Sequence, residues 1–352
     1  MNYMKKNGYF HDVTAETPTR FWINNPTIKE AKLAIEAGAV GCTTNPAYSS
    51  KMLLDADESV IVKNLIREAL PHYKNDDDVA SVVQRSLVKR LTELFMPIYS
   101  RSNGKEGFVT IQCNPLLETG ADYIISDGRE SRKISPNIMV KIPVTDAGIA
   151  AIETLARENN PVMATEVMAV SQAISICEAY KSASVKSGNS PAFYVTHITG
   201  ILDDYFREVV KLNNLSIPKE ILSMAGISIA KKQYKLLKER NYPGRMLGGG
   251  ARKLEDFTAF VGGDLSITIN WKGFAEELIR THPPVTSLIN DLPDSKLVER
   301  LMSDLPDYKK AWDDSGMKEE EFFEYGGVEL FRNSFIKGWN DLKSEIAAQR
   351  KL

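Results

Sequence analysis

Short apolar runs alternate with longer amphipathic stretches along almost the whole of this sequence, and this alternation limits the possible folds. Eight such runs occur, at Arg20–Ile23, Val40–Thr43, Phe108–Cys113, Ile138–Ile142, Pro161–Ala164, Ala192–Thr196, Arg245–Gly248 and Leu265–Ile269. The stretches between them, among them 146–158 and 227–240, repeat apolar residues at helical spacing. Strands that alternate with helices favour a parallel sheet. Eight units within about 250–270 residues match the size of a (β/α)8 TIM barrel, so we expect an α/β barrel.

Two longer intervals and the tail lie outside this rhythm. Residues 48–107 have enough apolar periodicity for two helices, and residues 114–137 contain a turn signal at 126–131. The tail, residues 284–352, has no strand signal and places apolar residues at helical spacing. No linker rich in Pro, Gly or Ser divides the chain. We therefore expect one domain over residues 1–352, with residues 284–352 as a helical extension packed on the barrel.

The composition is that of an ordinary globular protein of 352 residues, with 43% hydrophobic residues and a formal charge of -2. A chain so close to neutral lacks the basic surface of a nucleic-acid-binding protein. No run of about 18 apolar residues occurs, so we expect no membrane span. No apolar stretch follows the lysines near the N-terminus, so we expect no cleavable signal. A small molecule is the expected partner.

The cysteines and histidines indicate neither a disulfide framework nor a metal centre. The three cysteines are odd in number, widely spaced and free of any CxxC pattern; they are Cys42, Cys113 and Cys177. The four histidines lie far apart, without an HxH or HExxH pair; they are His11, His72, His197 and His282. We expect reduced thiols, a cytoplasmic location and no metal.

Polar residues stand where several of the predicted strands end. They are Asn24, Asn45, Gln112, Thr165, His197 and Arg252. In a (β/α)8 barrel the active site is built at the carboxyl ends of the strands and the loops that follow them. We therefore take these residues as candidates for the site.

Lys141 lies inside an apolar run, where both faces of the strand should be covered. Lysine is almost never fully buried unless it is paired, so Lys141 is either half of a structural ion pair or a long stem that reaches the rim. The alternative is a nucleophile, because burial lowers the pKa of an amine and leaves the neutral form that attacks a carbonyl. Position alone does not decide between the two.

Four segments together resemble the transaldolase family, including its fructose-6-phosphate aldolase branch. They are VGCTTNPAY (40–48), NIMVKIPVTDAGIAAIETL (137–155), YVTHITGILDDYF (194–206) and RMLGGGARKLEDF (245–257). The resemblance covers about residues 20–278, and the tail is similar to the C-terminal helix that folds over the site in longer members. It implies Schiff-base aldolase chemistry in carbohydrate metabolism, such as the pentose phosphate pathway, without cofactor or metal. It favours Lys141 as the imine-forming lysine.

The resemblance also assigns roles to residues around this lysine. Thr44 and Asn45 of TTNP would bind substrate, with the Asn45 amide on a hydroxyl next to the imine; otherwise Asn45 is a turn residue before Pro46. Thr165 would help to hold a catalytic water, or it caps a helix. Gln112 stands where transaldolases have a glutamate and the aldolase branch a glutamine. An amide can orient that water but cannot exchange its proton at neutral pH.

Two departures from the family weaken the expected site. Asn24 stands where the family has a proton-transferring aspartate, and an asparagine hydrogen-bonds a hydroxyl without taking its proton. Gly200 falls on one phosphate-binding arginine, whereas Arg252 matches the second. Gly250 replaces a serine two residues earlier, and the backbone of Gly249 and Gly250 either binds an anion or simply forms a turn.

A third departure supplies a titrating group. His197 stands where the family has phenylalanine or, in the aldolase branch, an acid–base tyrosine. Histidine titrates near neutrality, so it would serve as the acid–base residue. The alternatives are that His197 is a packing residue and that a water or a carboxylate such as Glu166 carries the proton.

The expected function is therefore an enzyme that forms an imine between Lys141 and a ketose or ketose phosphate and cleaves the C3–C4 bond. It would then transfer a three-carbon dihydroxyacetone unit, as a transaldolase, or release it, as an aldolase. The contrasting hypothesis is a sugar-phosphate-binding protein that has lost turnover, which Asn24 and Gly200 favour. The sequence leaves open whether the chain forms a homo-oligomer.

Overall fold

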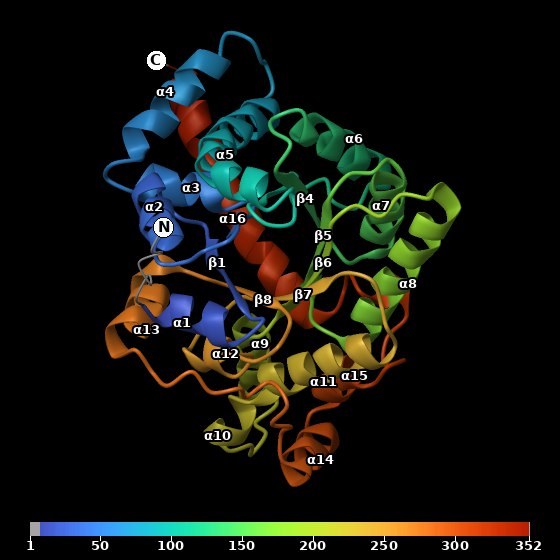
Figure 1. The fold of residues 1–352 in the computed structure, drawn as a ribbon. Coiled ribbons are helices and arrows are strands. Elements are labelled where there is room, and N and C mark those ends of the chain that lie inside the picture. The colour runs from blue at the N-terminus through green and yellow to red at the C-terminus, as the bar shows by residue number, and fades with distance from the viewer. Residues whose placement is uncertain (1–7, 352) are drawn as a thin grey trace.

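The computed structural model describes residues 8–351 and contains a closed barrel (Figure 1). Eight parallel strands pair in chain order, and β8 closes the barrel on β1. The strands are β1 (Arg20–Asn24), β2 (Cys42–Thr43), β3 (Val109–Gln112), β4 (Ile138–Pro143), β5 (Val162–Val167), β6 (Phe193–Ile198), β7 (Arg245–Gly249) and β8 (Ser266–Ile269). Each overlaps one predicted run, so the prediction of an α/β barrel is confirmed.

Helices surround the strands, and local capping fixes where several of them begin. The Thr27 hydroxyl accepts from the N–H of Glu30 while the Glu30 carboxylate accepts from the N–H of Thr27, which starts α2 (Ile28–Glu36). The Thr145 hydroxyl caps α7 by accepting from the N–H of Gly148. The remaining elements of this ring are α1 (Tyr9–Glu16), α7 (Asp146–Arg157), α8 (Val170–Ser187), α9 (Gly200–Leu212), α10 (Lys219–Leu222), α11 (Ala225–Glu239), α12 (Glu255–Thr258), η1 (Trp271–Ala275) and α13 (Glu276–Thr281).

The two long intervals hold more helix than the sequence predicts. Residues 48–107 form three helices instead of two: α3 (Tyr48–Leu54), α4 (Ser59–Ala69) and α5 (Asp76–Arg101). The extra break occurs where the Asp55 carboxylate accepts from the N–H groups of Asp57 and Glu58 and ends α3.

The turn expected at 126–131 is wrong, because α6 (Ala121–Arg132) runs through it. Gly128 serves close packing there. A Cβ on it would lie 2.9 Å from Leu155 Cδ1 and 3.2 Å from Val140 Cγ1.

Large apolar side chains fill the middle of the barrel and close its interior below the carboxyl ends of the strands. They are Trp22, Phe108, Met139, Met163, Tyr194 and Leu247. Successive side chains on a strand point to opposite faces. The residues two positions further on, among them Asn24 after Trp22 and Lys141 after Met139, therefore face the same interior one layer nearer the carboxyl ends.

The chain after residue 284 is helical in the part that the structure describes. It forms α14 (Ser295–Asp304), α15 (Pro306–Trp312), the short η2 (Glu319–Glu321) and the long α16 (Gly326–Gln349). In Figure 1, α16 is the red helix that crosses the barrel, and it contacts α3, α5, α9 and β5. None of the helices within residues 8–351 is both long and apolar enough to cross a membrane.

Asp77, in the first turn of α5, fastens α16 to the barrel. Its carboxylate accepts from Trp339 Nε1 and Lys343 Nζ, both at 2.7 Å, and from Asn114 Nδ2 at 3.0 Å. Burial acts to raise the pKa of Asp77, but the hydrogen bonds from Lys343 and Trp339 outweigh it and hold the pKa below the ordinary 3.8.

Asp77→Ala should lower the free energy of unfolding in urea by about 2 kcal/mol more than Asp78→Ala. Asp78 is the matched control, because it is exposed on the same helical turn and gives the same favourable charge to the helix N-terminus. A carboxyl with a depressed folded pKa stabilises the fold above its unfolded pKa. The difference between the variants should therefore shrink as the pH falls below 3.8. Equal losses in both variants would show that Asp77 does not fasten α16.

Candidate active site

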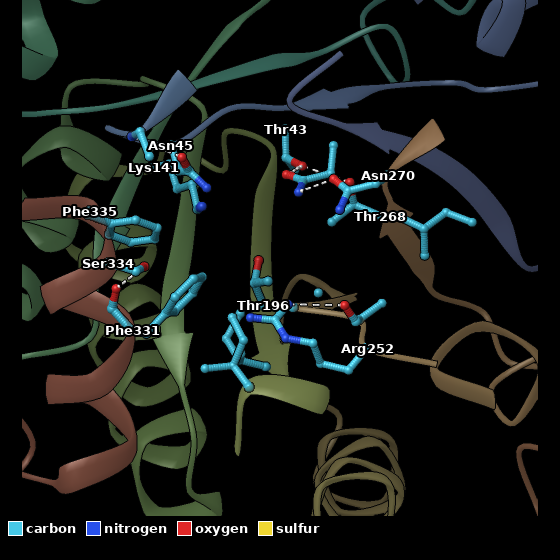
Figure 2. Close-up of a pocket in the computed structure, with 18 residues that line it drawn as sticks. Thr43, Asn45, Lys141, Thr196, Arg252, Thr268, Asn270, Phe331, Ser334 and Phe335 are labelled. Atoms are coloured by element: carbon cyan, nitrogen blue, oxygen red, sulfur yellow. Dashed lines mark hydrogen bonds between the residues drawn. The ribbon is translucent and has the colours of Figure 1, made fainter. Parts of the chain in front are cut away.

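A cavity of about 220 Å³ opens at the carboxyl ends of the strands, between the barrel and α16 (Figure 2). It brings together many residues expected from the sequence: Asn24, Asn45, Lys141, Gly249, Gly250 and Arg252. It also gathers groups that the sequence did not single out, which are Thr43, Thr196, Thr268, Asn270, Phe331, Ser334 and Phe335. Seven of the eighteen lining residues carry a hydroxyl or an amide, and an equal number are apolar, among them Phe331 and Phe335 of α16.

Lys141 stands on β4 with its side chain in the barrel interior, and only 5% of the residue is exposed. Its Nζ lies 5.7 Å from the centroid of the Phe335 ring, so α16 covers the amine. Burial lowers the pKa of Lys141 from 10.5 to about 8, although the nearby Glu166 carboxylate acts in the opposite direction. A substantial fraction of this amine is thus neutral near physiological pH.

Glu166 reaches the same interior because β5 is irregular there. The register of β5 against β6 shifts between Ala164 and Val167, and Glu166 has a φ of 58°. The left-handed region costs a non-glycine residue about 1–2 kcal/mol, and such strain gathers at functional sites. Gln172 fixes the irregular segment by donating to the carbonyls of Glu166 and Val144 and accepting from the N–H groups of Met168 and Ala169.

The Glu166 carboxylate reaches across β4 to Gln112 on β3. Gln112 Nε2 donates to Glu166 Oε1 at 3.0 Å, and Gln112 pairs in register with Lys141 on the strand between them. Burial raises the pKa of Glu166 to about 7, while Gln112 and Lys141 lower it. Lys141 and Glu166 therefore titrate as one coupled pair.

A second buried carboxyl, Glu118, lies beside this pair in the loop after β3. Burial and the charge of Glu166 raise the pKa of Glu118 to about 9, while Arg332 on α16 and Gln112 lower it. Glu118 is consequently protonated and uncharged at neutral pH. Lys141 then interacts mainly with Glu166 among these carboxyls.

Asn24 belongs to a polar cluster on the β1–β8 side of the cavity, visible in Figure 2. Its Nδ2 donates to Asn270 Oδ1 at 3.0 Å, and its Oδ1 accepts from Thr43 Oγ1 at 3.0 Å. The Thr43 and Thr268 hydroxyls lie 2.7 Å apart. None of these four groups titrates near neutral pH, so the cluster offers hydrogen bonds but no base.

Asn45 lines the cavity, whereas its neighbour Thr44 does not. Asn45 shares this lining with Lys141, and its Oδ1 accepts from the N–H of Ala47, which leaves its Nδ2 for the cavity (Figure 2). Thr44 exchanges hydrogen bonds with Thr110, with its hydroxyl 2.6 Å from the Thr110 carbonyl, and does not line the cavity. The geometry supports no substrate contact by Thr44.

Gln112 and Thr165 are fully buried and are not among the residues that line the cavity. Gln112 Oε1, Thr165 Oγ1 and Glu166 Oε2 each lack a hydrogen-bond partner within the described chain. Buried polar atoms without a protein partner are normally satisfied by water.

His197 corrects the sequence interpretation. It falls between Thr196 and Ile198, which both line the cavity, so the alternation of the strand turns His197 to the outer face of the barrel. Its Nδ1 lies 2.9 Å from Oε1 of Gln233 on α11, and burial lowers its pKa to about 4. An uncharged histidine between the barrel and a helix cannot exchange protons with a substrate in the cavity.

Arg252 enters the cavity from the loop after β7 (Figure 2), with 48% of its side chain exposed. Gly249 and Gly250 precede it, and Gly250 has a φ of 70°. The sequence interpretation missed Asn270, although it follows the eighth apolar run in the same way as the residues that were chosen. Within residues 8–351, no group of three His, Cys, Asp or Glu side chains is placed to hold a metal ion.

Comparison with known proteins adds independent evidence. The family model described as Transaldolase/Fructose-6-phosphate aldolase matches residues 21–335. Similar relatives include the transaldolases of Neisseria gonorrhoeae, 26% identical over 61% of this chain and 62% of that protein, and of Mycobacterium ulcerans, 24% identical over 57% and 55%. Another is the transaldolase of Thiobacillus denitrificans, 28% identical over 43% of this chain and 42% of that protein.

The chain therefore spans at most about three-fifths of the length of these relatives. A solved 2,3-dimethylmalate lyase covers 92% of this chain and 95% of its own, but at 10% identity and a TM-score of 0.33 it carries no argument. The family match extends from β1 to Phe335 on α16 and includes the whole cavity described above. The chain belongs to the transaldolase/fructose-6-phosphate aldolase family.

Proposed function

We propose that this chain is an enzyme that forms an imine between Lys141 Nζ and the carbonyl carbon of a ketose. The observation that carries the proposal is the buried amine of Lys141 at the floor of a polar cavity, with its pKa lowered to about 8. A neutral amine attacks a carbonyl, whereas an ammonium ion does not. Hydroxyl and amide groups on the other walls suit a chain of sugar hydroxyls.

The reaction follows from that imine. Lys141 Nζ adds to the C2 carbonyl and water leaves, which gives an iminium ion. A base takes the proton of the C4 hydroxyl, the C3–C4 bond breaks, and its electron pair moves toward the iminium to form an enamine, while C4 leaves as an aldehyde. The enamine then attacks a second aldehyde, whose oxygen takes up a proton, or it takes up a proton itself at C3. In either case water hydrolyses the resulting iminium ion, which releases the new ketose or dihydroxyacetone and restores the Lys141 amine.

Glu166 is the proposed proton-transfer group. Asn24 and Gln112 cannot exchange protons at neutral pH, and His197 faces away from the cavity. Glu166 has a pKa raised to about 7 by burial, close to the value at which a general acid–base residue works best. A water bound by the unpartnered atoms of Gln112, Thr165 and Glu166 would carry the proton between this carboxylate and the substrate.

Transfer and release differ only in what resolves the enamine. Gln112, which matches the aldolase branch, favours release, while the tail helix over the site is similar to that of longer members. Product analysis with and without an acceptor aldehyde separates the two. The alternative of a protein that only binds sugar, which Asn24 and Gly200 favour, predicts no covalent adduct.

Borohydride should reduce a ketose onto Lys141 and onto no other lysine, and Lys141→Arg should abolish the adduct, because a guanidinium stays protonated. Lys231→Arg is the matched control, since Lys231 is also buried with a lowered pKa but donates to the carbonyls of Leu288 and Asp291. It should still give the adduct. The readout is the mass of the intact protein and its peptides. An adduct at a single lysine in Lys141→Arg would refute the assignment.

The yield of the borohydride-reduced adduct should rise with pH and level off above about 8, the pKa of Lys141. With an ordinary lysine the yield would continue to rise up to a pKa of 10.5. Glu166→Gln removes the charge that raises the pKa of Lys141, so its curve should shift to lower pH. The same variant should lose about 10²–10⁴-fold in kcat for cleavage, the usual size of an acid–base contribution. A structural role alone would not improve one step and impair the other.

Glu118→Gln is the control for this variant. Because Glu118 is uncharged below a pKa of about 9, an amide in its place should leave the trapping curve nearly unchanged at neutral pH. If Glu166→Gln cleaves substrate at the wild-type rate with an unshifted pH profile, another group carries the proton.

A further inference from the structure

At the Arg252 end of the cavity, the hydrogen-bond donors that could bind an anionic substrate are already paired with carboxylates of the protein. Arg252 Nε donates to Asp204 Oδ2 at 2.7 Å, and Arg252 Nη1 donates to the Ala251 carbonyl at 3.2 Å. Asp204 lies on α9, which begins at Gly200, the glycine that stands in place of the family's other arginine. Arg252 has the one guanidinium that lines the cavity within residues 8–351, and this guanidinium is therefore already paired with a neighbouring carboxylate.

The backbone donors and the adjacent lysine are engaged in the same way. The N–H groups of Arg252 and Lys253 both donate to Asp256 Oδ2, at 2.7 and 3.2 Å. Lys253 Nζ donates to Asp203 Oδ2 at 2.9 Å. Asp203 and Asp256 are each 1% exposed. Arg252 and Lys253 thus face three carboxylates at this end of the site, and one of these carboxylates, Asp204, is shared with Arg207.

Close packing excludes a second arginine or a serine from the positions where the family has them. A Cβ on Gly200 would lie 2.7 Å from the Cβ, Cγ and N atoms of Arg252. A Cβ on Gly250 would lie 2.5 Å from Ile198 Cγ2, and this glycine has a positive φ as well. Neither position has room for a side chain unless its neighbours move.

Further cations lie nearby but outside the cavity. Arg207 and Lys211 line an adjoining groove on α9 together with Glu208, and Arg207 also pairs with Asp204. Ile198, Ile201 and Phe331 give the cavity wall an apolar surface, and the Ser334 hydroxyl, which also lines the cavity, donates to the Phe331 carbonyl.

We propose that the ketose bound by this site is unphosphorylated, with an uncharged hydroxyl-bearing end at Arg252. This inference rests on the proposed function and names its substrate class. A phosphate dianion at Arg252 would meet the carboxylate of Asp204 on the same guanidinium, and would have to share that cation with it or displace it. A sugar hydroxyl can share the existing hydrogen bonds without displacing a charge.

The test uses D-fructose, D-fructose 6-phosphate and inorganic phosphate. In the wild-type protein, phosphate at tens of millimolar should not raise the fructose concentration that gives half-maximal borohydride trapping at Lys141. Asp204→Asn frees the guanidinium, so phosphate should begin to compete, and the ratio of half-maximal concentrations should move toward fructose 6-phosphate by about fivefold, the upper worth of an exposed ion pair. Glu208→Gln removes a like charge from the same helix without touching Arg252 and should change neither quantity.

Competition by phosphate in the wild type, with no change of the ratio in Asp204→Asn, would overturn the proposal. Calorimetric titration with inorganic phosphate gives a readout that needs no imine. Binding that is absent in the wild type and present in Asp204→Asn supports the proposal even if no ketose is trapped, in which case the proposed function fails alone. Phosphate binding to the wild type below about 1 mM refutes the proposal whatever the trapping shows.

Discussion

The exclusion of water from the Lys141 amine is the constraint on which the rest of the site depends. A closed barrel covers both faces of β4, the apolar layer at Met139 and Met163 closes the interior below, and Phe335 of α16 closes it above. In such surroundings the ammonium form loses hydration that no neighbour fully replaces, so the pKa falls. The fold thereby increases the neutral fraction of this amine near physiological pH.

The same burial also changes the pKa values of the neighbouring carboxyls. Water exclusion raises the pKa values of Glu166 and Glu118, but Glu166 lies near Lys141 and Gln112 and so titrates lower than Glu118. Two carboxyls of one kind therefore differ in charge at neutral pH because of their neighbours. The irregular backbone at Glu166, fixed by Gln172, is what brings this charge beside the amine.

The strands and the lysine could be predicted from sequence because each depends on a local pattern. Alternating runs identified all eight strands, and an isolated lysine in one run identified Lys141. Glu166 could not be assigned, since its orientation depends on one extra residue in β5 that no local pattern marks. His197 was misassigned although its signal was present: counting by twos from the buried Tyr194 reaches Thr196, which faces the cavity, and leaves His197 outside. The ion pair of Arg252 with Asp204 joins the loop after β7 to α9 and has no signature in the local sequence.

The most direct test of this account is the pKa of Lys141 itself. Protein labelled with ¹³C at the lysine Cε atoms can be titrated by NMR, with Lys141→Arg assigning the signal that disappears. The account predicts one lysine that titrates near 8, well separated from the exposed lysines near 10.5, and a further decrease in Glu166→Gln. A Lys141 signal that titrates with the exposed lysines would contradict it, because the amine would then be hydrated and almost fully protonated at the pH where the proposed imine would form.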